Sequence, residues 1–192
     1  MLTVEADAGS VERRLAAGDL LCPGCGGRLA PWGWARPRVL RGPAAVTVRV
    51  RPRRTQCRWC AITHVLVPVV ALARRADLAE VIGSALAAKA SGAGVRAIAA
   101  VLSRPVDTVR GWLRRFAARA EAVRVAFTRL LVAYGPDPMV PAATGSLFAD
   151  AVAAMVAAVA AVIARWPALG AVSPWLTASA ATNGRLLAPS WP

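Results

Sequence analysis

Two pairs of cysteines, each pair separated by two residues, constrain this chain more than any other feature. Cys22 and Cys25 form the first pair, Cys57 and Cys60 form the second, and these four are all the cysteines of the 192-residue chain. Each pair supplies two thiolates from one tight turn, and residues 26–56 are long enough for a hairpin that returns the second pair to the first. The pattern therefore predicts a structural zinc (Zn2+) site with four cysteine ligands and no open coordination position.

Two disulfides, or four free thiols, are the alternative interpretation of these cysteines. Disulfides require an oxidising compartment, whereas residues 1–14 carry Glu5, Asp7 and Glu12 and lack the apolar stretch of a signal peptide. We therefore expect a cytoplasmic protein with reduced, metal-binding cysteines. His64 lies four residues after Cys60 and is a candidate for a spare ligand, although a lone histidine in a strand is more often structural.

The second constraint is a large positive charge. The chain has 24 Lys and Arg residues against 10 Asp and Glu, a net charge of +14, and Lys89 is its single lysine. No acidic residue lies between Asp19 and Asp77. The arginines of that stretch are Arg28, Arg36, Arg38, Arg41, Arg49, Arg51, Arg53, Arg54, Arg58, Arg74 and Arg75. A GC-rich genome would explain the preference for arginine but not the missing carboxylates, so the pattern indicates a polyanionic partner, most simply nucleic acid.

The pattern of apolar residues, prolines and glycines predicts an α+β chain, with a small β-rich zinc ribbon followed by a helix-turn-helix bundle and an alanine-rich helical tail. The expected segments are a polar leader at 1–19, a four-cysteine zinc ribbon at 20–70, a helix-turn-helix domain at 71–133, a Pro/Gly linker at 134–146 and a helical tail at 147–192. Within the leader, a helical turn is expected around residues 11–17.

Strand signals in the ribbon segment place arginines on one face. Val46, Val48 and Val50 alternate with Thr47, Arg49 and Arg51, a period of two that is typical of a strand with one packed face. Residues 62–70 form a second β-branched run. The candidate DNA-binding residues of the ribbon are Arg49, Arg51, Arg53 and Arg54.

The segment after the ribbon predicts three helices, at 77–90, 95–102 and 106–118. Residues 103–105 form a tight turn before the third helix, whose apolar stripe is Val109, Trp112, Leu113 and Phe116. This spacing is typical of a helix-turn-helix, although an ordinary helical hairpin with a solvated charged face remains an alternative.

The second helix of that motif carries the predicted DNA contacts. Its first turn would meet base edges or nearby phosphates, whereas residues farther along would meet phosphates. The candidates are Asp107, Thr108 and Arg110 in the first group and Arg114 and Arg115 in the second.

These motifs resemble a known combination. Residues 95–115, Val-Arg-Ala-Ile-Ala-Ala-Val-Leu-Ser-Arg-Pro-Val-Asp-Thr-Val-Arg-Gly-Trp-Leu-Arg-Arg, resemble the helix-turn-helix of transposase-type and resolvase-type modules. The motifs Cys-Pro-Gly-Cys at 22–25 and Arg-Arg-Thr-Gln-Cys-Arg-Trp-Cys at 53–60 resemble the N-terminal zinc ribbon of insertion-sequence transposases. With residues 63–68, they are similar to a family of uncharacterised actinobacterial zinc-ribbon and helix-turn-helix proteins over about residues 20–120. The resemblance implies zinc on the four cysteines, DNA contact near Val106 and no catalysis.

The remaining carboxylates do not support an enzyme. After Phe116 the chain has only Glu121, Asp137 and Asp150, in helix-like or linker sequence, so the two-metal chemistry of a transposase has no predicted scaffold. A Ser-His-Asp site is equally unsupported because His64 is the only histidine. We therefore expect a DNA-binding regulator, or the DNA-binding part of a mobile element without its nuclease.

The alanine-rich tail has two interpretations. Residues 147–164 carry one charge, Asp150, and reach the lower length limit for a membrane span. Apolar residues nevertheless recur at spacings of four and three, which favours a packing helix or a homodimer through 147–166 over a span. This heptad seam comprises Phe148, Val152, Met155, Val159, Val162 and Trp166. Two further functions stay open, namely a zinc-stabilised protein-interaction adaptor that uses this helix and a membrane-anchored form of the DNA binder.

Overall fold

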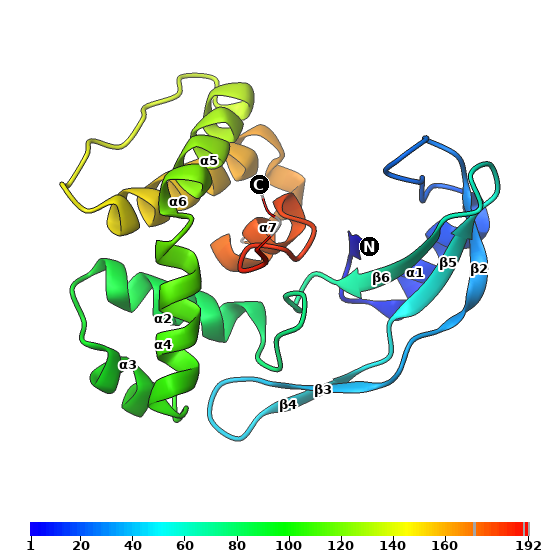
Figure 1. The fold of residues 1–192 in the computed structure, drawn as a ribbon. Helices are drawn as coiled ribbons and strands as arrows, with labels where there is room; N and C mark the ends of the chain where they lie inside the picture. The colour runs from blue at the N-terminus through cyan, green and yellow to red at the C-terminus, as the bar shows by residue number, and fades with distance from the viewer. Residues whose placement is uncertain (171, 190, 192) are drawn as a thin grey trace.

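The computed structural model describes residues 1–170, 172–189 and 191, and it has an α+β fold (Figure 1). A small sheet with a short helix lies at one side of the molecule, and the longer helices gather at the other side. A β-hairpin extends from the sheet beneath the helical part. The predicted fold class is confirmed.

The described residues form six strands, with the bounds β1 Leu2–Val4, β2 Leu29–Trp34, β3 Arg38–Arg41, β4 Thr47–Val50, β5 Arg53–Cys57 and β6 Thr63–Pro68. Four of them form a sheet in the order β1-β6-β5-β2, and β3 and β4 form the separate hairpin. β1 runs parallel to β6, whereas the other neighbours are antiparallel. The predicted strand at residues 46–51 is β4, and the predicted run at residues 62–70 is β6.

The polar leader packs onto the ribbon rather than lying apart from it. Its helix α1, Ala8–Ala17, begins at Asp7, whose carboxylate accepts the Ser10 N–H at 2.7 Å. Val11 and Leu15 of α1 are buried in a small apolar core together with Leu29, Leu66 and the buried pair Cys22 and Cys57. The sheet, α1 and the cysteine knuckles therefore share one core within residues 1–68.

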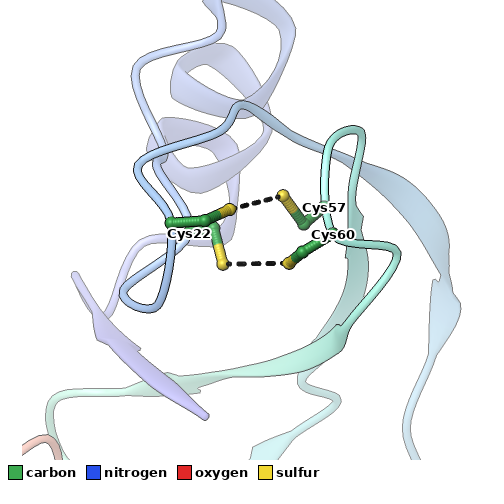
Figure 2. Close-up of side chains that lie close together, drawn as sticks. Cys22, Cys57 and Cys60 are labelled. Carbon is green, nitrogen blue, oxygen red and sulfur yellow. Dashed lines mark hydrogen bonds between the residues drawn. The ribbon is translucent and has the colours of Figure 1, made fainter.

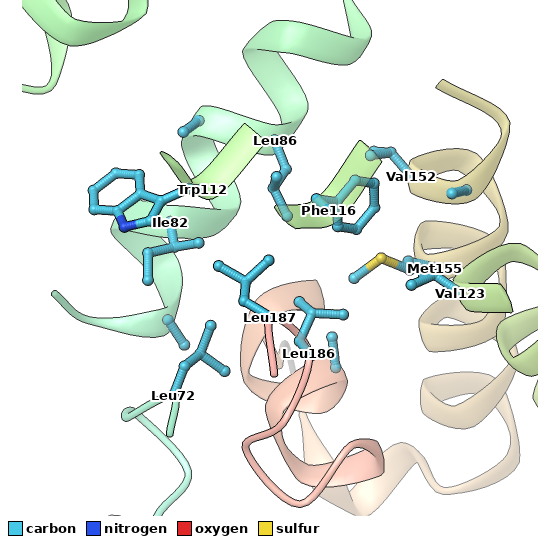
Figure 3. Packing of buried hydrophobic residues seen from close by; sticks show 14 of the residues in the cluster. Leu72, Ile82, Leu86, Trp112, Phe116, Val123, Val152, Met155, Leu186 and Leu187 are labelled. Atoms are coloured by element: carbon cyan, nitrogen blue, oxygen red, sulfur yellow. The ribbon is translucent and has the colours of Figure 1, made fainter. Parts of the chain in front are cut away.

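Helices occupy the positions that the apolar periodicity predicts. Their bounds are α2 Ala79–Ala90, α3 Val95–Val101, α4 Val106–Ala117, α5 Ala120–Tyr134, α6 Leu147–Arg165 and α7 Pro174–Ala181. The predicted stripe of α4 is buried in the larger core, where Trp112 and Phe116 pack near Leu86 of α2 (Figure 3). Ser103 adopts a left-handed conformation, φ 52°, in the turn between α3 and α4.

The heptad seam of α6 packs inside the chain. Val152, Met155 and Val159 are buried, and α6 lies along α5. The Phe148 ring lies 4.7 Å from that of Phe116, and Trp166 lies 5.1 Å from Tyr134. Among the described residues, α6 is the one helix long and apolar enough to cross a membrane. The middle of the seam therefore packs within the chain, and a homodimer through 147–166 stays a prediction.

The carboxyl-terminal segment completes the helical core. Leu186 and Leu187 are buried between α2, α6 and α7 (Figure 3). The Ala73 N–H donates to the Gly184 carbonyl at 2.7 Å, and Arg75 donates to the Leu187 carbonyl at 3.4 Å. These contacts fix the segment against the chain that enters α2.

Candidate metal centre and basic surface

The structure brings the four predicted cysteine ligands together. The four sulfurs lie within 4.8 Å of one another, with Cys22 Sγ 3.8 Å from Cys60 Sγ and Cys25 Sγ 3.4 Å from Cys57 Sγ (Figure 2). A tetrahedral zinc with bonds of about 2.3 Å requires sulfur separations of roughly 3.8 Å. The cluster thus has the ligand type, number and spacing of a structural zinc site, and all four cysteines are free thiols rather than disulfides.

The two knuckles have the same backbone geometry. In each, the first cysteine donates its N–H to the carbonyl five residues later, and the residue four positions later donates back to the cysteine carbonyl. The bonds are Cys22–Gly27 (2.8 Å), Gly26–Cys22 (2.9 Å), Cys57–Ile62 (2.9 Å) and Ala61–Cys57 (3.1 Å). The fourth position after the cysteine is left-handed in both, with φ 72° at Gly26 and 57° at Ala61. Glycine adopts this conformation freely, whereas alanine is strained there.

Backbone N–H groups stabilise the thiolate form of the buried cysteines. The Cys60 N–H lowers the pKa of the Cys57 thiol to about 6, and the Gly24 N–H lowers the pKa of the Cys22 thiol. Zinc binds the thiolate, so these donors favour the metal-binding form and orient the sulfurs. At Cys25 the Gly27 N–H acts in the same direction, but the neighbouring Cys57 sulfur and burial outweigh it and raise the pKa of the Cys25 thiol to about 12. The turns therefore position the ligands and favour the thiolate form of the two buried cysteines.

His64 lies beside the cluster rather than within its four-ligand set. Its Nε2 lies 3.4 Å from Cys22 Sγ, and burial lowers the pKa of its imidazole. A neutral imidazole touching a ligand sulfur is a supporting contact that orients the thiolate. The spacing from Cys60 predicts that His64 lies near the metal. Its contact with Cys22 of the first knuckle, in contrast, depends on the pairing of β5 with β6.

Gly27 is a residue of the site that sequence reasoning missed. A Cβ at this position would lie 2.9 Å from Cys57 Sγ and equally close to the Trp59 ring. Only glycine permits this approach of one knuckle to the other. The available signal was the Gly26-Gly27 pair that directly follows Cys25.

The predicted DNA-binding residues of α4 share its outer face. Asp107 and Arg110 are exposed and form an ion pair with each other, while Thr108 is half-buried. Arg114 is exposed, and Arg115 donates to the Gly111 carbonyl at 2.9 Å. The face is therefore accessible, with the Arg110 guanidinium held over the first turn of the helix.

The ribbon arginines divide into two groups. Arg49, Arg51 and Arg54 are exposed. Arg53 is mostly buried, because its Nε lies 2.9 Å from Glu12 Oε1 and its guanidinium lies 4.5 Å from the centre of the Trp34 ring. Arg53 therefore joins α1 to the sheet and does not belong to the free basic surface. No local pattern indicates this pair, because Glu12 lies far from Arg53 along the chain.

A buried ionic cluster joins the ribbon hairpin to the helices. Asp77, with its side chain 2% exposed, contacts Arg104 Nε at 2.7 Å and Arg41 Nη2 at 2.8 Å. Arg104 also donates to the carbonyl of Gly42 at the end of β3. Arg104 belongs to the turn between α3 and α4, so the cluster fixes the β3–β4 hairpin against that turn.

Comparison of the chain with protein-family models, with curated proteins and with solved structures gave no match.

Proposed function

We propose that this chain is a zinc-containing protein that binds double-stranded DNA in a sequence-specific manner, with α3 and α4 acting as a helix-turn-helix. The observation that carries the proposal is the outer face of α4, where exposed Asp107, Arg110 and Arg114 lie opposite a fully packed stripe. A helix that is anchored on one side and basic on the other has the form required for the major groove. No catalytic role is assigned to the chain.

The basic ribbon would supply contacts to the DNA backbone. Arg49, Arg51 and Arg54 are exposed, and none of them takes part in an ion pair among the described residues. Arginines on a strand face neutralise phosphates without reading sequence. The Asp77 cluster joins the β3–β4 hairpin to the turn before α4. It therefore supports a fixed relation between the ribbon arginines and the outer face of α4, so that both would contact one duplex in a constant register.

The zinc part of the proposal is tested by metal content and folding. The purified chain should hold one zinc, and Cys57→Ser should lose the metal and unfold the sheet, because a structural site supplies folding free energy. Chelation followed by zinc addition to the unaltered chain should restore the circular dichroism spectrum. Protein prepared without chelator that contains no zinc would contradict the assignment.

The DNA part is tested with two arginine variants. Arg110→Ala should lower affinity at a selected site by roughly 1–3 kcal/mol and relax its sequence preference. Arg51→Ala should weaken binding to selected and scrambled duplexes equally, because a phosphate contact carries no sequence information. With roughly 4–6 phosphate contacts, the slope of log affinity against log salt should be about −4 to −5. Equal losses on both duplexes for Arg110→Ala would show that α4 does not read sequence.

A protein-interaction adaptor is the second candidate. The observation in its favour is that Leu21, Trp59 and Ile62, which belong to or flank the knuckles, are all exposed, Trp59 to 77%. Exposed apolar side chains on a rigid zinc module are suited to a protein partner. The seam of α6 no longer supports this function, because it is packed against α5. A chain that binds no duplex at low salt would favour the adaptor.

A further inference from the structure

A large cavity lies between the zinc-binding sheet and the carboxyl-terminal segment. Its volume is about 650 Å3, which falls within the usual range for small-molecule sites. Figure 1 shows the carboxyl-terminal segment, in red, on the side of the helices that faces β6. The cavity is separate from the outer face of α4 and from the cysteine cluster, because neither contributes to its wall.

Five arginines line the cavity and no acidic residue does. They come from three parts of the chain, namely Arg36 and Arg38 before and in β3, Arg74 and Arg75 before α2, and Arg185 after α7. None of the ion pairs among the described residues involves any of the five. Guanidinium groups gathered around one space repel each other, so the arrangement favours an anionic ligand.

Two of these arginines are held in place by the backbone. Arg38 donates to the Arg75 carbonyl at 2.6 Å, and Arg75 donates to the Leu187 carbonyl at 3.4 Å. The Arg75 Nε is buried and has no hydrogen-bond partner among the described residues. Burial, followed by the charge of Arg115, lowers the pKa of Arg75. The guanidinium of Arg75 is thus half-buried at the wall of the cavity, and the backbone sets its position.

Apart from the α-ammonium of Met1, whose charge interacts with that of Arg185, the rest of the wall is apolar. Its members include Pro52, Val65, Val67, Ala188 and Pro189. A single phosphate would fill only a small part of this space, whereas a phosphorylated organic molecule would place its apolar or planar part on this wall. A planar guanidinium group can donate two parallel hydrogen bonds to two oxygens of one phosphate.

We propose that this cavity binds a small organic polyphosphate of about the size of a nucleoside triphosphate. The phosphates lie among Arg36, Arg75 and Arg185, and the organic part lies against the apolar wall. Because the arginines come from the ribbon, the entry to α2 and the carboxyl-terminal segment, the bound ligand ties these three parts together. Binding therefore raises the thermal stability of the chain by an amount that grows with the logarithm of ligand concentration once the dissociation constant is exceeded.

The test is calorimetric titration of the full zinc-loaded chain with adenosine 5′-triphosphate, inorganic pyrophosphate and adenosine. The triphosphate should bind one to one and raise the melting temperature, pyrophosphate should compete with it, and adenosine alone should bind far more weakly. The double variant Arg36→Gln, Arg185→Gln should weaken triphosphate binding by about tenfold or more, since each substitution removes one guanidinium group that would bind phosphate oxygens. Neither side chain takes part in the hydrogen bonds among described residues that hold Arg38 and Arg75.

The matched control is a second double variant, Arg129→Gln with Arg165→Gln, which removes the same two charges from exposed positions on α5 and at the end of α6. It should bind the triphosphate as the unaltered chain does. Equal weakening in the control and in the Arg36→Gln, Arg185→Gln variant, or no saturable binding at millimolar triphosphate, would overturn the proposal. Duplex DNA provides a separate comparison. One outcome would reject the small-ligand site: the unaltered chain binds no triphosphate, and the double variant Arg36→Gln, Arg185→Gln binds duplex DNA more weakly. The cavity would then contact DNA phosphates instead.

Discussion

Replacing Asp77 with asparagine should destabilise the chain more than any single change to its exposed ion pairs. Asp77→Asn keeps the shape of the side chain but removes the charge that offsets Arg104, whose side chain is 5% exposed. Removing one partner of a buried pair leaves an uncompensated charge and costs roughly 3–5 kcal/mol. For a chain of this size that corresponds to a fall of about 6–20 °C in melting temperature.

The control for this change is Arg41→Gln. Arg41 contacts the same carboxylate at 2.8 Å, but its side chain is 46% exposed. Solvent screens such a pair, so the expected loss is about 1 kcal/mol or less. Arg104 would keep its contact with Asp77 in this variant, and the buried charge would stay compensated.

Urea unfolding of both variants, followed by circular dichroism at constant zinc, measures the difference. Zinc content should be unchanged in both variants, because the Asp77 cluster lies outside the small core that holds the cysteines. Equal destabilisation by Asp77→Asn and Arg41→Gln would refute the reasoning, since it would mean that burial of Arg104 does not set the energy of the cluster.

Three further changes test the packing, the second knuckle and the contact between the linker and Asp150 of α6. Gly83→Ala should lower the free energy of unfolding by about 1–3 kcal/mol in thermal melts, despite the better helix propensity of alanine, because the new Cβ would lie 2.0 Å from the Trp175 ring. Ala61→Gly should raise it by about 1 kcal/mol by relieving a left-handed alanine, and a loss of stability would contradict the knuckle geometry. The Thr144 N–H, in the linker before α6, donates to Asp150 and lowers the pKa of its carboxyl group. The contribution of this contact to the stability of the chain should be present at neutral pH and be lost as pH falls through the pKa of Asp150 in the folded state. Urea titrations of Asp150→Asn and the unaltered chain should therefore differ at pH 7 and converge in acid.

Much of the local structure could be predicted because its causes are local. The CxxC spacing predicts the cluster of four thiols, and the periods of 2 and 3.6 predict β4 and α4 close to their observed bounds. The stripe of Trp112 and Phe116 in the helix encodes the buried face, whereas the valine alternation indicates a face on which Val48 and Val50 are half-buried and Val46 is exposed. In these cases neighbouring residues carry the whole signal.

The remaining features depend on contacts between distant segments. Arg53 looks like its neighbour Arg54 in the sequence, but the packing of α1 brings Glu12 to it and leaves Arg54 exposed. The Asp77 cluster needs the hairpin and the α3–α4 turn to meet, which no periodicity indicates. β1 gave no signal because its parallel pairing with β6 joins residues far apart along the chain.

The place of Leu186 and Leu187 in the helical core has a consequence for the order in which the chain folds during synthesis. The small core with the cysteines lies within residues 1–68, so the zinc module has all its parts early. The larger core lacks two of its buried leucines until residues 186 and 187 are made. At about 5–20 residues per second, residues 69–187 require roughly 6–24 s. During that interval a folded zinc module would precede helices with an open apolar surface, and this surface is where a chaperone would act.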